Sequence, residues 1–119
     1  MKKILIIEDN DSNRELLSFL LAYNRFEVIT ARDGVEGVKK AREELPDLIL
    51  MDIQMPHLDG LKATREIRRD SRLKDVPIIA VTSYVMPGDR EKIMASGCNG
   101  YIGKPIDTDT IVDEIKHFL

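Results

Sequence analysis

The sequence has only one cysteine and two histidines, and these shortages exclude several kinds of site. A single cysteine cannot form an intrachain disulfide framework or a paired-cysteine metal knuckle. Two histidines argue against a histidine-rich zinc site. The 18 Lys and Arg residues are outnumbered by 21 Asp and Glu residues, giving a net charge of −3. A nucleic-acid-binding domain needs a basic excess, so we expect no direct binding to DNA.

Long hydrophobic runs are also missing. No apolar run approaches the roughly 18 residues that cross a membrane. Lys2 and Lys3 precede an apolar run, but Glu8 and Asp9 end it after four residues, which excludes a signal peptide. The chain has 119 residues, of which 43% are hydrophobic, enough for one domain with its own core. We therefore expect a single soluble, cytoplasmic domain over residues 1–119.

Short apolar segments alternate with longer amphipathic ones along the whole chain. Strands are expected at 4–7, 27–30, 48–51, 78–81 and 101–102. Helices are expected where apolar residues recur at helical spacing: Leu16, Leu17, Leu20 and Leu21; Val35, Val38, Ala41 and Leu45; Leu61, Thr64 and Ile67; the segment from Pro87 to Ser96; and Ile111, Val112, Ile115 and Phe118. This alternation predicts an α/β fold, with a five-stranded parallel sheet and helices on both faces.

Three local signals predict where helices begin and end. Ser12 with Glu15 three residues later forms a plausible capping box for the first helix. Pro87 suits the first turn of the fourth helix, and Gly97 suits its carboxyl end.

Basic residues of the third helix and the loop after it interleave with acids, which is typical of a solvated face. They are Lys62, Arg65, Arg68, Arg69, Arg72 and Lys74.

Polar side chains follow the apolar strands at the edge where ligands bind in open parallel sheets. Glu8 and Asp9 follow the first strand, and Asp52 directly follows the third. Thr82 follows the fourth strand and Lys104 follows the fifth. Because the carboxyl ends of parallel strands share one edge, we expect three carboxylates, a hydroxyl and an ammonium group to meet there.

Each of these residues also has a structural explanation when taken alone. Glu8 and Asp9 suit the amino end of a helix, Thr82 suits a strand-end cap, and Lys104 suits a solvated surface. Asp52 is different, because stability does not explain an acid directly after a fully apolar strand. Taken together, the carboxylates favour a hard cation such as Mg²⁺. With the lysine and the hydroxyl they suit phosphoryl transfer, with a carboxylate as the attacking group.

The motifs resemble those of the receiver domain of bacterial two-component response regulators over essentially the full length. They are Glu8-Asp9, the segment 50–56 around Asp52, Asp59-Gly60, Thr82 and Lys104-Pro105. The resemblance implies a flavodoxin-like fold with strand order 2-1-3-4-5. The segment 85–92 is similar to receivers of hybrid-kinase phosphorelays and to stand-alone regulators of the DivK type.

The resemblance also implies a role for each residue of the acidic cluster. Asp52 corresponds to the phosphoacceptor. Asp9, Asp52 and the backbone carbonyl of Gln54 correspond to direct ligands of Mg²⁺, while Glu8 acts mainly through water. Lys104 corresponds to the residue that pairs with phosphoryl oxygens, and its bond to the following proline is expected to be cis.

A second group of residues is implied to respond to the phosphoryl group. Thr82 corresponds to the hydroxyl that binds it, and Tyr101 to an aromatic switch that packs inward. A half-buried tyrosine at the sheet edge explains Tyr101 equally well. Gln54 and Tyr84 flank the mouth of the site and are expected to tune the lifetime of the acyl phosphate. The surface expected to change comprises the fourth helix, the fifth strand and the fifth helix.

The implied partners are a histidine kinase or histidine phosphotransfer protein and a downstream protein target, with no metabolite turned over. One rival is a Mg²⁺-dependent phosphohydrolase with an aspartate nucleophile, but Gln54 occupies the place of its second acid. Another is a phosphorylation-independent binding module, which typically lacks Asp52, Thr82 or Lys104. A third is a receiver excised from a hybrid kinase or a multidomain regulator. The start at Met1 favours a free-standing chain, and the end at Leu119 leaves a downstream output domain open.

Overall fold

The computed structural model describes residues 1–55, 57–83 and 86–119, and their strands form one parallel sheet ordered β2-β1-β3-β4-β5. The strands are β1 (Lys3–Ile7), β2 (Glu27–Ala31), β3 (Leu48–Asp52), β4 (Ile78–Thr82) and β5 (Gly100–Gly103). The helices are α1 (Asp11–Tyr23), α2 (Gly34–Glu44), α3 (Gly60–Arg68), the 3₁₀ turn η1 (Ser71–Leu73), α4 (Asp89–Ala95) and α5 (Ile111–His117). The predicted fold class and strand order are confirmed.

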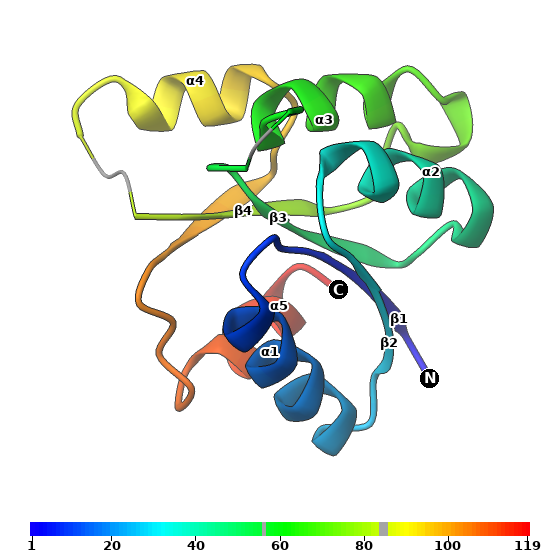
Figure 1. Ribbon diagram of the computed structural model, residues 1–119, viewed down its shortest axis with the longest axis vertical. Coiled ribbons are helices and arrows are strands. Elements are labelled where there is room, and N and C mark those ends of the chain that lie inside the picture. Colours follow the sequence, from blue (N-terminus) through cyan, green and yellow to red (C-terminus); the bar gives the residue numbers. More distant parts are fainter. Residues whose placement is uncertain (56, 84–85) are drawn as a thin grey trace.

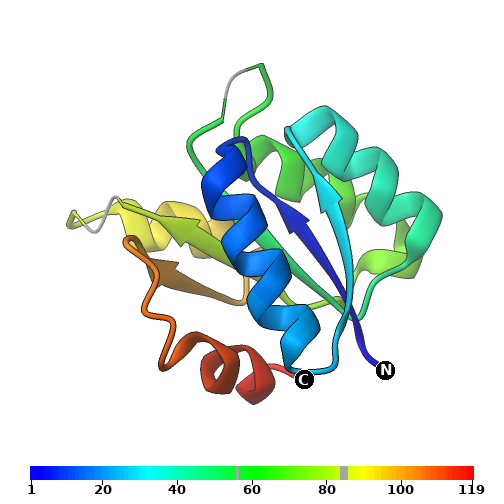
Figure 2. The same cartoon turned by 60° about the horizontal axis from the view of Figure 1, so that its bottom comes forward.

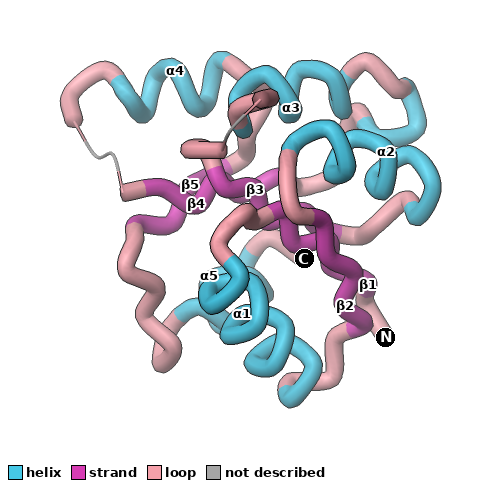
Figure 3. Tube along the Cα trace, viewed as in Figure 1, coloured by secondary structure: helices cyan, strands magenta, loops and turns pink. Residues whose placement is uncertain are grey.

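The sheet lies between two layers of helices (Figures 1 and 3). Helices α2, α3 and α4 cover one face, and α1 and α5 cover the other. Side chains alternate along each central strand between two buried clusters. In β1, Leu5 and Ile7 belong to the cluster under α2 and α3, whereas Ile4 and Ile6 belong to the cluster under α1 and α5. The central strands are apolar throughout because helices cover both of their faces.

The helices of the described residues are short. The helix α1 has 13 residues and α2 has 11. Among residues 1–55, 57–83 and 86–119, no helix is both long enough and apolar enough to cross a membrane.

The first helix does not begin as the sequence pattern predicted. Asn10 is its N-cap, with extended backbone angles, and its side chain accepts a hydrogen bond from the Asn13 N–H at 2.9 Å. The predicted capping box of Ser12 and Glu15 is therefore wrong, because both residues already lie inside the helix. An asparagine serves as well as a serine at this position, and here it lies directly after the acidic pair that ends β1.

Three further details differ from the predicted helices. Val35 lies on the outside of the first turn of α2 and is 61% exposed. Leu45 ends α2 in the left-handed conformation with φ 46° and is 44% exposed, so neither residue belongs to the core stripe. Helix α4 begins at Asp89, two residues after Pro87. The predicted end at Gly97 is confirmed, because this glycine follows the C-cap with φ 113°.

Candidate metal centre at the carboxyl edge of the sheet

Strand register brings the predicted polar residues to one edge of the sheet. Ile7 of β1 pairs with Met51 of β3, so Glu8 and Asp52 extend from neighbouring strands side by side. Thr82 pairs with Gly103, which places Lys104 next to the end of β4. The Lys104 N–H also donates to the carbonyl oxygen of Thr82 at 2.8 Å. The loop between β1 and α1 lies at the opposite end of the molecule from both termini (Figure 2).

Three carboxylates gather at this edge. One oxygen atom from each of Glu8, Asp9 and Asp52 lies within 4.8 Å of the other two. Glu8 and Asp52 are each only 2% exposed, whereas Asp9 is exposed at the mouth. Carboxylates this close repel one another unless a cation or a proton offsets their charge.

Lys104 is the cation that faces the two buried acids. Its Nζ lies 3.1 Å from Oδ1 of Asp52 and 3.2 Å from Oε1 of Glu8. The peptide bond from Lys104 to Pro105 is cis, as the resemblance implied. One ammonium group thus serves two buried carboxylates, which leaves the cluster short of positive charge.

The lack of positive charge shifts the pKa values of Glu8 and Asp52. Burial, together with the neighbouring carboxyl groups of Glu8 and Asp9, raises the pKa of Asp52 to about 8. Burial opposes ionisation of Glu8 as well, but its interactions with Asp52 and Lys104 hold its pKa below the usual range. The same two acids raise the pKa of Lys104 despite its burial. A proton held by the Glu8 and Asp52 pair therefore offsets part of their charge when no other cation is present.

Two buried carboxylate oxygens lack a hydrogen-bond partner among the described residues. Within the part of the chain that the structure describes, Oδ2 of Asp52 and Oε1 of Glu8 have no hydrogen-bond partner, the latter despite its ion-pair distance to Lys104. Buried polar atoms are normally satisfied, so orphaned carboxylate oxygens indicate a site for a ligand. A set of oxygen donors without histidine or thiolate fits a hard divalent cation such as Mg²⁺.

Gln54 lies two residues after Asp52, and its side chain reaches the end of β4. Its Nε2 donates to Oγ1 of the buried Thr82 at 3.2 Å, and its Oε1 accepts from Oγ of Ser83 at 3.2 Å. Its backbone N–H donates to Oδ1 of Asp52 at 3.3 Å. Its carbonyl oxygen remains a predicted metal ligand. Tyr84, also expected to flank the mouth, lies outside the described residues.

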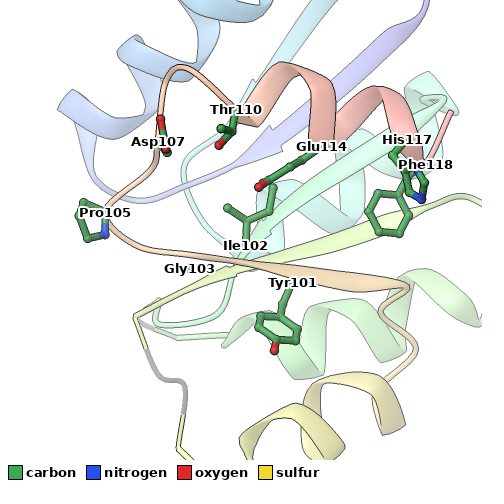
Figure 4. A pocket seen from close by; sticks show the side chains of 9 residues that line it. All are labelled: Tyr101, Ile102, Gly103, Pro105, Asp107, Thr110, Glu114, His117 and Phe118. Carbon is green, nitrogen blue, oxygen red and sulfur yellow. The ribbon is translucent and has the colours of Figure 1, made fainter.

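Tyr101 lies on the outer strand β5 and is 37% exposed. Figure 4 shows its ring on the α4 side of the strand, while Ile102 points toward α5. The inward packing of this ring remains a prediction.

Sequence reasoning missed two residues that support the site. Arg14, in the first turn of α1, donates from Nη1 to the Glu8 carbonyl oxygen at 3.0 Å and from Nη2 to Oδ1 of Asp11. It braces the loop that carries Asp9. The second is Ser83, through its bond to Gln54. Arg14 could have been found from the sequence, because it lies only five residues after Asp9. The bond between Gln54 and Ser83 could not, because the two residues lie far apart in the chain.

Comparison with known proteins places the chain in a family. Residues 4–116 match the family described as the response regulator receiver domain. The chain is 43% identical over 118 residues to the polar-differentiation response regulator DivK of Brucella anthropi, an alignment that covers 99% of this chain and 96% of DivK. The same identity and coverage hold for DivK of Brucella melitensis.

Solved structures agree with the sequence comparison. The chemotaxis protein CheY4 of Vibrio cholerae superposes with a TM-score of 0.96 at 31% identity, covering 100% of this chain and 99% of that one. The receiver domain of the sensor histidine kinase PA1611 from Pseudomonas aeruginosa has a TM-score of 0.91 at 36% identity, covering 98% and 96%. In that structure a magnesium ion is coordinated in the active-site cleft. Receiver domains are signalling domains that generally bind Mg²⁺ at an acidic pocket and interact with histidine kinases and downstream targets. The chain belongs to this receiver-domain family of two-component response regulators.

Proposed function

We propose that residues 1–119 form a single-domain, cytoplasmic response regulator that takes a phosphoryl group from phosphohistidine onto Asp52. The donor is a histidine kinase or a histidine phosphotransfer protein, and the output is a protein–protein contact rather than contact with DNA or a membrane. The observation that carries the proposal is the buried Oδ2 of Asp52, which has no partner among the described residues although it sits beside Lys104 and two further acids.

Asp52 acts as the nucleophile. One of its carboxylate oxygens attacks phosphorus, a P–O bond forms, and the P–N bond to the donor imidazole breaks with its electron pair on nitrogen. The attacking group has to be ionised, and the high pKa of Asp52 shows what opposes this in the isolated cluster. Additional positive charge at the cluster therefore promotes both ionisation and transfer.

Mg²⁺ would be held by Asp9, Asp52 and the Gln54 carbonyl, with Glu8 acting mainly through water. When bound, it supplies charge neutralisation for the phosphoryl oxygens during transfer. Glu8 and Asp52 are held ready for it by burial, and Asp9 is held at the mouth by the loop that Arg14 braces. The matched receiver domain with magnesium in its cleft supports this assignment by similarity.

Lys104 and Thr82 bind the oxygens of the phosphoryl group after its transfer to Asp52. The Lys104 ammonium, now 3.1 Å from Oδ1 of Asp52, exchanges that contact for the phosphoryl oxygens. The Thr82 hydroxyl donates to another of these oxygens, and Tyr101 packs inward beside it. This population shift can be no larger than the preference of the phosphoryl group for one of the two states. Gln54 and Tyr84 tune how long the acyl phosphate survives.

Two surfaces would serve the partners. The donor would dock at the mouth, where a pocket of about 420 Å³ is lined by Asn13, Leu16, Ser83, Lys104, Pro105 and Ile106. On α1 it would contact Leu16, which is 44% exposed, because Leu17 and Leu21 are buried in the core. The output surface would be α4, β5 and α5, where a pocket of about 300 Å³ lies between β5 and α5 (Figure 4).

The test is the intact mass of the protein after incubation with acetyl phosphate, with and without Mg²⁺. We expect a labile single-phosphate adduct that requires Mg²⁺ and is lost in Asp52→Asn. Asp113→Asn, which changes an exposed acid on α5, should keep the adduct. Absence of both adduct and donor hydrolysis in the wild type would indicate a phosphorylation-independent binding module. Rapid turnover of varied phosphate esters would indicate a phosphohydrolase.

A further inference from the structure

The Gln54 side chain bridges two consecutive residues at the end of β4. Its amide nitrogen donates to Thr82 and its amide oxygen accepts from Ser83, both at 3.2 Å. Both hydroxyls can donate as well as accept, so the amide contacts Thr82 and Ser83 in either orientation of its nitrogen and oxygen. Thr82 is fully buried, and its hydroxyl is one of the two that the amide contacts.

We propose that Gln54 is a positioning residue that holds the Thr82 hydroxyl in its resting place and so opposes the switch of the site. The inference rests on the proposed function and adds a regulatory role within the same site. It differs from tuning of the acyl-phosphate lifetime, because a resting-state restraint changes an equilibrium and not only a rate of hydrolysis.

The restraint follows from the anchoring of Gln54 at three points. Its backbone N–H donates to Asp52, while its amide is bound to both Thr82 and Ser83. The Thr82 hydroxyl can shift toward a group on Asp52 only if its bond to the amide breaks or the amide leaves Ser83. Either change gives up a hydrogen bond of the resting state, and this loss is subtracted from what the new contact contributes.

The expected size follows from the net value of one hydrogen bond. A single bond of this kind shifts a two-state equilibrium by about fivefold. Removing the amide should therefore make the site accept a phosphoryl group more readily by about that factor. Removing only the Ser83 anchor should act in the same direction but by about twofold, because the amide keeps its bond to Thr82.

The test measures the apparent dissociation constant for beryllofluoride at saturating Mg²⁺, from backbone amide chemical shifts. Beryllofluoride binds a carboxylate oxygen and presents fluorines in place of phosphoryl oxygens. We expect Gln54→Met, which keeps the length of the side chain without its amide, to bind about fivefold more tightly than wild type. Ser83→Ala should show a smaller gain. Thr82→Val removes the hydroxyl, so adding Gln54→Met to it should produce no further change.

Four outcomes would overturn the inference. Gln54→Met could leave the affinity unchanged or weaken it. It could also tighten binding equally with threonine or valine at position 82, which would mean that it acts on the ligand directly. Failure of the proposed function is distinguishable, because then the wild type itself would bind no beryllofluoride. Ser83→Ala leaves Thr82 intact, so a lack of any gain there counts against the restraint even if Thr82→Val loses binding altogether.

Discussion

Two cationic side chains lie at opposite edges of the sheet, and their surroundings differ in one respect. At the amino edge, Arg68 uses all five of its N–H groups. They donate to Gly97 O twice and to the oxygens of Leu73, Val76 and Asn99 once each, at 2.6–3.0 Å. At the carboxyl edge, Lys104 faces two buried carboxylates, and oxygen atoms there still lack hydrogen-bond partners among the described residues.

The difference separates a cluster whose polar groups are all satisfied from one that has room for a ligand. Around Arg68, each N–H meets a neutral oxygen from the segments before β4 and β5, so the guanidinium joins the end of α3 to two loops. It leaves nothing for a ligand to complete. Around Lys104, negative charge exceeds positive charge, and the buried atoms can be satisfied only by a cation or a proton. Both clusters contain buried polar groups, but only the incomplete one indicates a binding site.

Breaking the complete cluster should have the largest effect. Arg68→Ala leaves three carbonyl oxygens in two segments without their donor, and we expect it to lower the free energy of unfolding by about 3 kcal/mol. Arg68→Lys should recover less than half, because an ammonium group cannot reproduce the planar fork. Urea denaturation measures both. Arg69→Ala is the control, since its side chain is 73% exposed and should change stability by about 0.5 kcal/mol or less. Equal losses for the two alanine variants would contradict the comparison.

Removing the charge of Asp52 should raise the free energy of unfolding, whereas the Arg68 variants lower it. The pKa of Asp52 is raised from 3.8 to about 8 in the folded state, so folding takes up a proton between these values. Stability contributed by this group is therefore lost as the pH rises from about 4 to about 8. We expect Asp52→Asn to be more stable than wild type, with its advantage growing by about 1.4 kcal/mol per pH unit between pH 5 and pH 7. Urea denaturation in the presence of a chelator measures it, and a destabilised Asp52→Asn would contradict it.

Completing the acidic cluster with a cation should release the proton. Below pH 8, Mg²⁺ has to displace a proton from Asp52, so its affinity should rise about tenfold per pH unit between pH 6 and pH 7 and level off above pH 8. Calorimetry in two buffers of different ionisation enthalpy would count the protons released. In Asp52→Asn the pH dependence should disappear, and its persistence there would assign the proton to another group.

The smallest effect concerns how the acidic loop is held in place. Asn10 caps α1 directly after the acidic pair, so Asn10→Ala should cost about 1 kcal/mol in the free energy of unfolding. Ser12→Ala should cost at most about 0.3 kcal/mol, because Ser12 lies exposed within the helix. Thermal unfolding compares the pair. A larger loss for Ser12→Ala would restore the capping box that the sequence pattern predicted.

Much of the site could be predicted from sequence because strand ends are easy to recognise. Fully apolar segments such as 48–51 indicate buried parallel strands, and the residue after such a segment has to emerge at a known edge. This reasoning predicts that Asp52, Glu8 and Lys104 lie together, and in the structure Lys104 Nζ lies within 3.2 Å of an oxygen of each acid. The roles of these residues remain predictions.

Arg68 shows where such reasoning fails. The sequence pattern predicted a solvated face for Arg68 and its basic neighbours, whereas the structure places it among carbonyl oxygens of the two segments before β4 and β5. Backbone acceptors leave no mark on a sequence, because every residue carries one. The same holds for Val35, whose helical spacing matched the core stripe although its side chain points outward.

The sequence by itself determined the alternation of strands and helices, the parallel sheet and the edge at which the acids gather. These features depend on apolar periodicity and on local chain chemistry, which any reader of the sequence can see. Only the tertiary structure decided which oxygen atoms stay without a partner and which hydroxyl Gln54 holds. Such choices depend on distances of a few ångströms between segments far apart in the chain, and those distances exist only once the core has packed.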